Sequence, residues 1–149
     1  MDAKVLAALL KTLVGRRFGQ GFIVKNIKKP SMLGGANETI LFEIDCSGKN
    51  QPLVLRRQTY FEEKSPFLSM TDQFKTLKLA FNYMIEAPEP LFMLDREDNL
   101  GEGFVMRFVE GETVPKKILS EESFKNARDN LAQQCGEVLA NIHSIPAEN

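Results

Sequence analysis

The segment from Ser31 to Arg57 constrains the fold of this chain more than any other, because a glycine-rich turn adjoins two stretches with strand-like alternation. The turn is Ser-Met-Leu-Gly-Gly-Ala-Asn, the first alternating stretch covers residues 38–44, and the second covers residues 52–57. This order predicts a strand, a tight turn and a strand. Backbone amides of a glycine-rich turn and an arginine at a strand end can meet at one anionic group, so the segment also suggests a phosphate site.

Alternation along residues 52–57 separates the two arginines that end this stretch. Successive side chains of a strand point to opposite faces, so Arg56 shares a face with Val54, whereas Arg57 shares the other face with Leu53 and Leu55. The two guanidinium groups therefore cannot both point toward the same ligand.

Five strands and three helices are predicted for the whole chain. The strands cover residues 22–29, 38–44, 52–57, 91–94 and 104–109. One helix begins at the cap Asp2 and ends near Gly15, a second is capped by Ser69 or Thr71, and a third is capped by Ser120. The predicted fold class is α+β, with a five-stranded antiparallel sheet that carries an inserted helix.

Apolar stripes indicate which faces are buried. The first helix and the strand at 38–44 each have one such face, formed by Val5, Leu6, Leu9, Leu10 and Leu13 and by Ile40, Phe42 and Ile44. The stripe of the inserted helix, which we expect to be core, consists of Met70, Phe74, Leu77, Phe81, Met84 and Ile85.

A connector at residues 111–115 is the one plausible unit boundary, and it divides the chain into residues 1–110 and 111–149. The second part holds a single long helix with a stripe formed by Phe124, Ala127, Leu131, Cys135, Val138 and Ile142. A lone amphipathic helix has no core of its own. Its stripe is expected to cover the preceding unit, a second copy in a dimer, or a segment missing from this chain.

Composition excludes several classes of function. The 149 residues are 43% hydrophobic and carry a formal net charge of −1, so one domain can bury a core and nothing suggests nucleic acid as a partner. Two distant cysteines and one histidine argue against zinc. No apolar run approaches the ~20 residues that span a bilayer, so we expect no membrane partner and a reducing, cytoplasmic location.

The motifs resemble, in order from about residue 22 to 145, those of the aminoglycoside phosphotransferase family. They are Leu-Gly-Gly-Ala-Asn-Glu-Thr, Leu-Val-Leu-Arg-Arg, Pro-Glu-Pro-Leu-Phe, Phe-Val-Met-Arg-Phe-Val-Glu-Gly-Glu and Leu-Ala-Asn-Ile-His-Ser-Ile. The resemblance implies a kinase-like N-terminal lobe followed by the first helix of a C-terminal lobe. It also implies ATP as the nucleotide and, in the complete protein, transfer of the γ-phosphate to a hydroxyl of a small molecule.

The resemblance assigns nucleotide-binding roles to particular residues. The turn Gly34, Gly35, Ala36 and Asn37 would close over the phosphates, because small residues let the backbone approach. Arg56 matches the third-strand cation that pairs with the α- and β-phosphates. Residues 104–106 would line the adenine pocket, and the base would bind the backbone of a hinge; the hinge side of the site comprises Met106, Arg107, Phe108 and Val109.

Two features depart from the family pattern. Relatives often place Glu on the inserted helix to hold the third-strand cation, whereas the matching residue here is Gln73. Its neutral amide accepts a hydrogen bond without the charge-assisted contribution. The His-Gly-Asp catalytic loop, its Asn and the downstream metal-binding Asp have no counterpart in these residues, so we expect this chain alone to be inactive and Mg²⁺ to bind only with the missing lobe.

Alternatives remain open at several positions. The glycine pair can be a plain hairpin turn, Arg56 can be a solvated edge-strand residue, and His143 can interact with the last carbonyls of its helix. Arg16, Arg17, Lys116 and Lys117 are interpreted as solvated charges. The alternative function is a non-catalytic kinase-like module for binding or assembly, and the coding sequence after Asn149 would distinguish the two.

Overall fold

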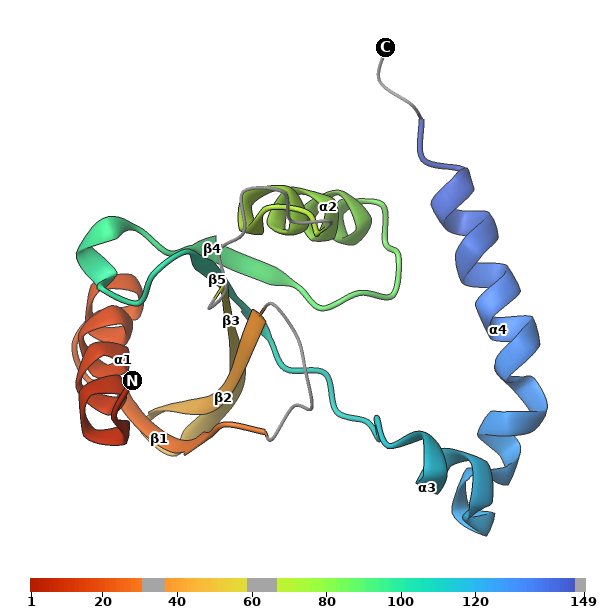
Figure 1. Cartoon of the computed structure of the whole chain (residues 1–149), viewed down its shortest axis with the longest axis horizontal. Coiled ribbons are helices and arrows are strands. Elements are labelled where there is room, and N and C mark those ends of the chain that lie inside the picture. Colours follow the sequence, from red (N-terminus) through yellow and green to blue (C-terminus); the bar gives the residue numbers. More distant parts are fainter. Residues whose placement is uncertain (31–36, 59–66, 147–149) are drawn as a thin grey trace.

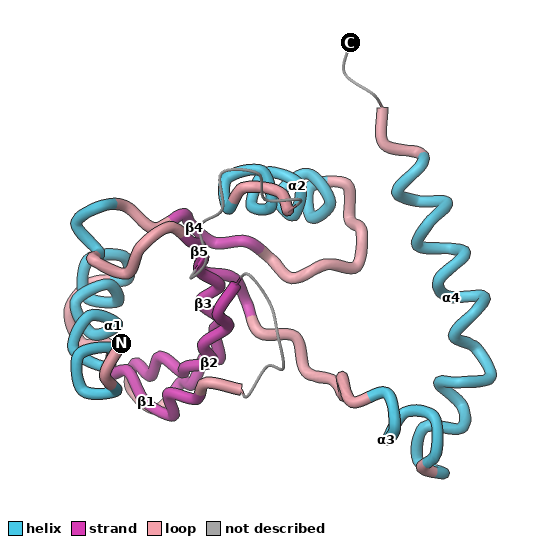
Figure 2. Tube along the Cα trace, in the orientation of Figure 1, coloured by secondary structure: helices cyan, strands magenta, loops and turns pink. Residues whose placement is uncertain are grey.

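Five antiparallel strands form the single sheet of the described chain in the computed structural model, which describes residues 1–30, 37–58 and 67–146. The spatial order is β1-β2-β3-β5-β4 (Figures 1 and 2). The strands are β1 (Ile23–Lys28), β2 (Asn37–Cys46), β3 (Lys49–Gln58), β4 (Pro90–Met93) and β5 (Gly103–Arg107). The predicted α+β class and antiparallel sheet are confirmed. The hairpin of β2 and β3 is longer than predicted, because their pairing continues to Cys46 opposite Lys49.

Helix α1 (Ala3–Phe18) covers one face of the sheet (Figure 1). Asp2 caps it as predicted, with its carboxylate accepting from the amide of Lys4 at 2.9 Å. The buried core between α1 and the sheet contains Leu6, Leu10, Leu13, Val14, Ile40, Phe42, Ile44, Leu53, Leu55, Leu100 and Val105. The apolar faces predicted for the first helix and for β2 therefore meet, although Val5 lies outside, 51% exposed.

The prediction that the first helix ends near Gly15 is wrong. The helix continues to Phe18 and ends at Gly19, whose φ of 93° lies in the left-handed region that glycine tolerates. The extra turn is stabilised by tertiary contacts, since the ring of Phe18 lies 5.7 Å from that of Phe22 and 5.9 Å from that of Phe92. These contacts outweigh the small propensity cost of one glycine inside a helix.

Helix α2 (Met70–Asn82) packs against β4 and β5. Ser69 caps it, and the ring of Phe74 contacts that of Phe104 at a centroid distance of 5.7 Å. The predicted stripe is only partly core, because Phe81 is 42% and Met84 91% exposed. The helix ends at Asn82, and Met84 has a φ of 58°, so the helical period does not extend to Met84.

After β5 the chain leaves the sheet and forms α3 (Pro115–Ser120), a 3₁₀ turn (Glu122–Phe124) and α4 (Lys125–His143), which stands apart from the sheet (Figures 1 and 2). The prediction that Ser120 caps the long helix is wrong. Ser120 is the last residue of α3, where its hydroxyl donates to the carbonyl of Lys116 at 2.7 Å. The extended backbone of Glu121 then separates α3 from the following turn.

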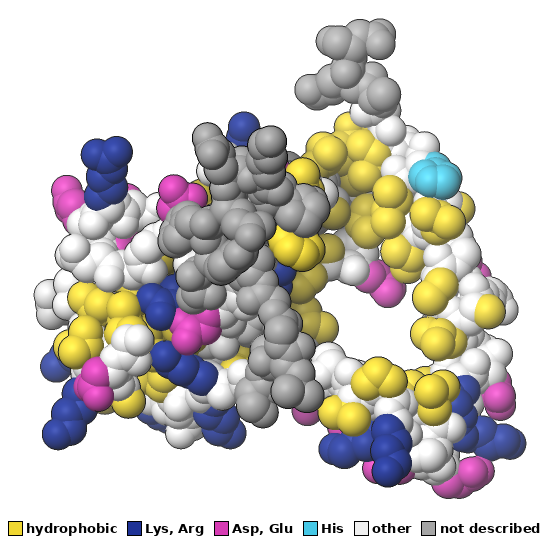
Figure 3. All heavy atoms as spheres, in the orientation of Figure 1, with side chains coloured by type: hydrophobic (Ala, Val, Ile, Leu, Met, Phe, Trp, Pro, Cys, Tyr) yellow, Lys and Arg dark blue, Asp and Glu magenta, His cyan; other side chains and the backbone are white. Residues whose placement is uncertain are grey.

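The apolar stripe of α4 is exposed in the described structure. Leu131, Leu139 and Ile142 are 49%, 52% and 43% exposed, and Figure 3 shows hydrophobic side chains gathered on the side of α4 that faces the sheet across an opening. A shallow hollow of 210 Å³ lies between this helix and residues 84–86. The division after residue 110 and a dimer through α4 stay predictions.

None of the described helices is long and apolar enough to cross a membrane.

Candidate nucleotide-binding site

Arg56 lies near the end of β3, on the face opposite α1. Its Nε donates to Oε1 of Gln73 on α2 at 3.0 Å, and the other end of the same amide donates from Nε2 to the carbonyl of Leu68 at 2.7 Å. The second bond fixes the amide with its oxygen toward the guanidinium. The structure thus brings together the two side chains that the sequence paired. The interpretation of Arg56 as a solvated edge-strand residue is wrong, since β3 is a central strand and Arg56 is half-buried.

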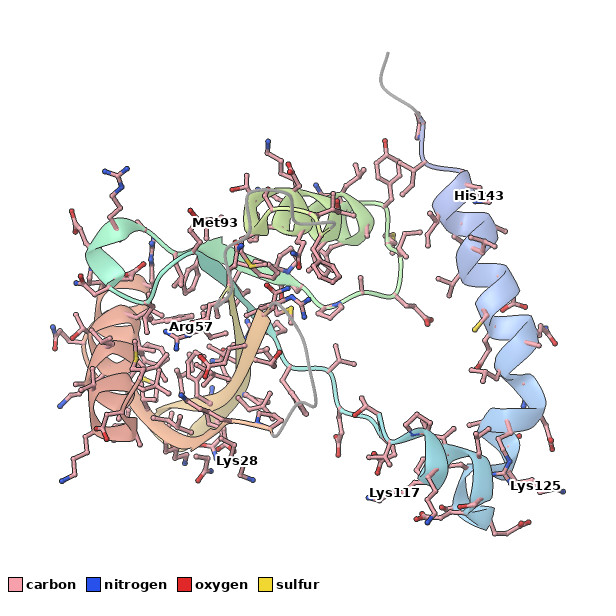
Figure 4. The ribbon with its side chains drawn as sticks, in the orientation of Figure 1. Lys28, Arg57, Met93, Lys117, Lys125 and His143 are labelled. Atoms are coloured by element: carbon pink, nitrogen blue, oxygen red, sulfur yellow. The ribbon has the colours of Figure 1, made fainter. Side chains whose placement is uncertain are left out.

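Arg57 points to the opposite face, as the strand alternation predicted. It is only 8% exposed and lies between the sheet and α1 (Figure 4). Its Nε donates to Glu38 at 2.6 Å, its Nη1 donates to the carbonyl of Leu100 at 3.2 Å, and Glu38 also pairs with Lys29 at 3.0 Å. Burial acts to raise the pKa of the Glu38 carboxyl, but its hydrogen bonds to Lys29 and Arg57 prevail and hold that pKa below its ordinary value.

A hollow of 210 Å³ lies on the sheet beside the start of the hinge segment, which we define as residues 107–109. Its lining includes Lys28, Leu41, Glu43, Pro52 and Phe108. Phe42 is buried beneath α1, so its neighbour Leu41 points to the other face of the sheet, the face that also carries Arg56. The hollow and the arginine therefore lie on the same face of the sheet.

Two of the three backbone amides in the hinge segment already donate hydrogen bonds within the protein. The amide of Arg107 donates to the carbonyl of Glu89 at 2.9 Å, and that of Phe108 donates to Pro52 at 3.2 Å. Within the described residues, the amide of Val109 makes no hydrogen bond, and this residue is 62% exposed. The Arg107 side chain is directed to Gln51 and Glu89, at 2.6 and 3.3 Å. The side chain of Arg107 therefore has other partners, and the predicted contact with the base concerns its backbone alone.

Two residues predicted to line the adenine pocket lie side by side in β5 but face opposite ways. Val105 belongs to the core beneath α1, so its predicted place in the adenine pocket is wrong. Met106 is half-buried and pairs with Val54 on β3, whose side chain is on the same face as that of Arg56. The predicted phosphate turn Gly34, Gly35 and Ala36 lies outside the described residues, whereas Asn37 begins β2 opposite Gln58.

A cluster of charges that the sequence did not reveal joins α1 to the turn between β4 and β5. Arg16 donates to Asp95, Glu97 and Asp98 at 3.2, 2.9 and 2.7 Å, and Arg17 donates to Asp95 at 2.8 Å. The interpretation of these arginines as solvated charges is wrong. Their acidic partners are about eighty residues later in sequence, and no local spacing signals such a contact.

The described residues do not contain a cluster of three or more His, Cys, Asp or Glu that could hold a metal ion. A magnesium ion prefers several oxygen ligands in octahedral geometry. The part of the chain that the structure describes therefore does not fit a complete site for Mg²⁺, and we assign no metal ligand in it.

Comparison with known proteins identifies the family. The family model described as "Phosphotransferase enzyme family" (APH) matches residues 34–149, which include most of the sheet, the inserted helix and α4. No curated protein matches the chain. Since the match covers more than half of the sequence, the chain belongs to the phosphotransferase enzyme family.

Proposed function

We propose that this chain contributes the ATP-binding part of a phosphotransferase. The adenine base occupies the hollow beside the hinge segment, and the phosphates lie toward Arg56. In the complete protein the γ-phosphate passes to a hydroxyl of a small molecule. The observation that carries the proposal is that Arg56 and the hollow share the face of the sheet opposite α1.

The separation along β3 fits a nucleotide laid along the strand. Pro52 borders the hollow and Arg56 lies four residues later, which is about 13 Å at the usual rise of a strand. An extended ligand with an apolar, hydrogen-bonding end and an anionic end matches this arrangement. The base would stack against Leu41, while the guanidinium would donate to phosphate oxygens as a planar fork.

Val109 is the hinge residue that we expect to donate to the base. The preceding two amides already donate to the carbonyls of Glu89 and Pro52, so a base could recruit them only by breaking those bonds. Recognition by a backbone amide does not depend on the side chain, which explains why an apolar residue can stand at this position. The backbone of Arg107 and Phe108 then leads the chain to Val109, and the Met106 side chain contributes apolar surface to the site.

Gln73 is proposed to hold Arg56 in place for the phosphates. Its oxygen is oriented toward the guanidinium by the bond of its nitrogen to Leu68. A neutral amide holds an arginine less strongly than a carboxylate does. Unlike a carboxylate, this amide adds no negative charge beside the guanidinium.

Calorimetric titration of the complete protein with ATP and Mg²⁺ tests the proposal. Arg56→Ala should weaken binding about tenfold or more, because a hydrogen bond between charged groups contributes about 1.5–3 kcal/mol. Arg57→Ala is the matched control from the same strand, compared at equal folded fraction because Arg57 is buried. Equal losses in the two variants, or no nucleotide binding by the complete protein, would contradict the proposal.

A non-catalytic binding module is the second candidate, and the neutral Gln73 favours it. The two candidates differ in turnover. Release of labelled phosphate or its transfer to an acceptor by the complete protein identifies an enzyme, whereas saturable ATP binding without turnover across a panel of small hydroxyl compounds identifies the module.

A further inference from the structure

Gly103, the first residue of β5, has no room for a side chain beside β3. A Cβ atom at Gly103 would collide with the carbonyl oxygen of Arg56 and would lie 2.9 Å from both Cα and Cβ of Arg57. These atoms belong to the backbone or to the root of a side chain, so they cannot rotate away. Any side chain at residue 103 would therefore force β3 and β5 apart at the two arginines.

The register places this close approach directly beside the proposed phosphate cation. Gly103 pairs with Arg57, and Phe104 pairs with Arg56. Backbone hydrogen bonds hold the start of β5 on both sides: the carbonyl of Glu102 accepts from Gln58 at the end of β3 at 2.9 Å, and that of Gly103 accepts from Leu94, just after β4, at 2.9 Å. With β5 held on both sides, a collision at residue 103 displaces the end of β3.

We propose that Gly103 is a positioning residue for Arg56: the missing side chain sets the spacing of β3 and β5 that brings the guanidinium beside Gln73 and the nucleotide phosphates. This inference rests on the proposed function. The phosphate end of the site is affected more than the base end, because the hinge segment lies at the opposite end of β5, about 13 Å away by strand rise.

The difference between the two ends suggests a test with two ligands. Binding of ADP and of adenosine to the full chain is measured by ligand-observed NMR for the unchanged protein and for Gly103→Ala. We expect about a tenfold loss for ADP, equivalent to one hydrogen bond between charged groups, and less than about a twofold loss for adenosine. Gly15→Ala is the matched control, since nothing lies within 4 Å of a Cβ there, and it should change neither affinity.

Each outcome decides a separate question. Unchanged ADP affinity in Gly103→Ala, or equal losses for ADP and adenosine, would overturn the positioning role. A variant that stays unfolded even in trimethylamine N-oxide, which favours the folded state, would also overturn it, because Gly103 would then be needed for folding itself. Failure of the unchanged protein to bind either ligand would instead overturn the proposed function.

Discussion

Replacing Glu38 with alanine would leave a buried guanidinium without its carboxylate. Arg57 is 8% exposed, and the remaining oxygen acceptor among the described residues would be the carbonyl of Leu100 at 3.2 Å. Removing one partner of a buried ion pair costs about 3–5 kcal/mol. The Glu38 side chain is 24% exposed, so water can partly solvate the gap, and the lower end of about 3 kcal/mol is expected.

Urea unfolding followed by circular dichroism at pH 7 measures this free energy, which corresponds to a fall in melting temperature of about 6–12 °C for a domain of this size. Glu43→Ala is the control. It removes a carboxylate from the same strand, and no hydrogen bond or ion pair of Glu43 is found among the described residues. A loss below about 1 kcal/mol for Glu38→Ala, or equal losses for both variants, would refute the reasoning.

The apolar double variant gives an independent check. Replacing Glu38 with leucine and Arg57 with methionine removes both charges, and well-packed apolar groups often match or exceed a buried ion pair in stability. The double variant should therefore be more stable than Glu38→Ala alone. A double variant that is less stable than Glu38→Ala would mean that interactions other than the attraction between the two charges stabilise Glu38 and Arg57.

Three further predictions concern stability. Asp98→Asn should lower the free energy of unfolding by about 2 kcal/mol, because the buried carboxylate accepts charged hydrogen bonds from Arg16; urea unfolding in 1 M salt should show that the loss persists. Stability should fall as pH drops below about 4.5 through the lowered pKa of Glu38, since the folded state binds that proton less readily, and Glu38→Gln should flatten this acid limb. Leu10→Ala should cost about 2–5 kcal/mol, against less than about 0.5 for the exposed Val5→Ala, in thermal unfolding.

Local periodicity accounts for the parts of this protein that the sequence predicted. The alternation in residues 52–57 separated Arg56 from Arg57 correctly, whereas the pairing of Gln73 with Arg56, which the structure also shows, was implied by the family resemblance. The first result depends only on a few neighbouring residues whose directions follow from the backbone geometry. The family resemblance was confirmed independently, by the family model that matches residues 34–149.

Long-range contacts account for the main failures. Arg16 and Arg17 have no local signal that distinguishes them from solvated charges, because their partners follow only after most of the sheet. The role of Glu38 was not identified from the sequence, although strand alternation puts Glu38 on the same face as Ile40. In the structure Glu38 pairs with Arg57 across the two strands. A charged residue on a predicted core face, opposite another in the paired strand, is the signal that could have identified this pair.

During synthesis, helix α1 is made well before several of the residues against which it packs. Its contact with Asp98 spans 82 residues, and the buried core beneath it includes Leu100 and Val105. At about 5–20 residues per second of synthesis, roughly 4–16 s pass between the synthesis of Arg16 and that of Asp98. During that interval the apolar stripe of α1 is available to chaperones. The completion of β5 thus determines when the N-terminal helix of the nascent chain can dock.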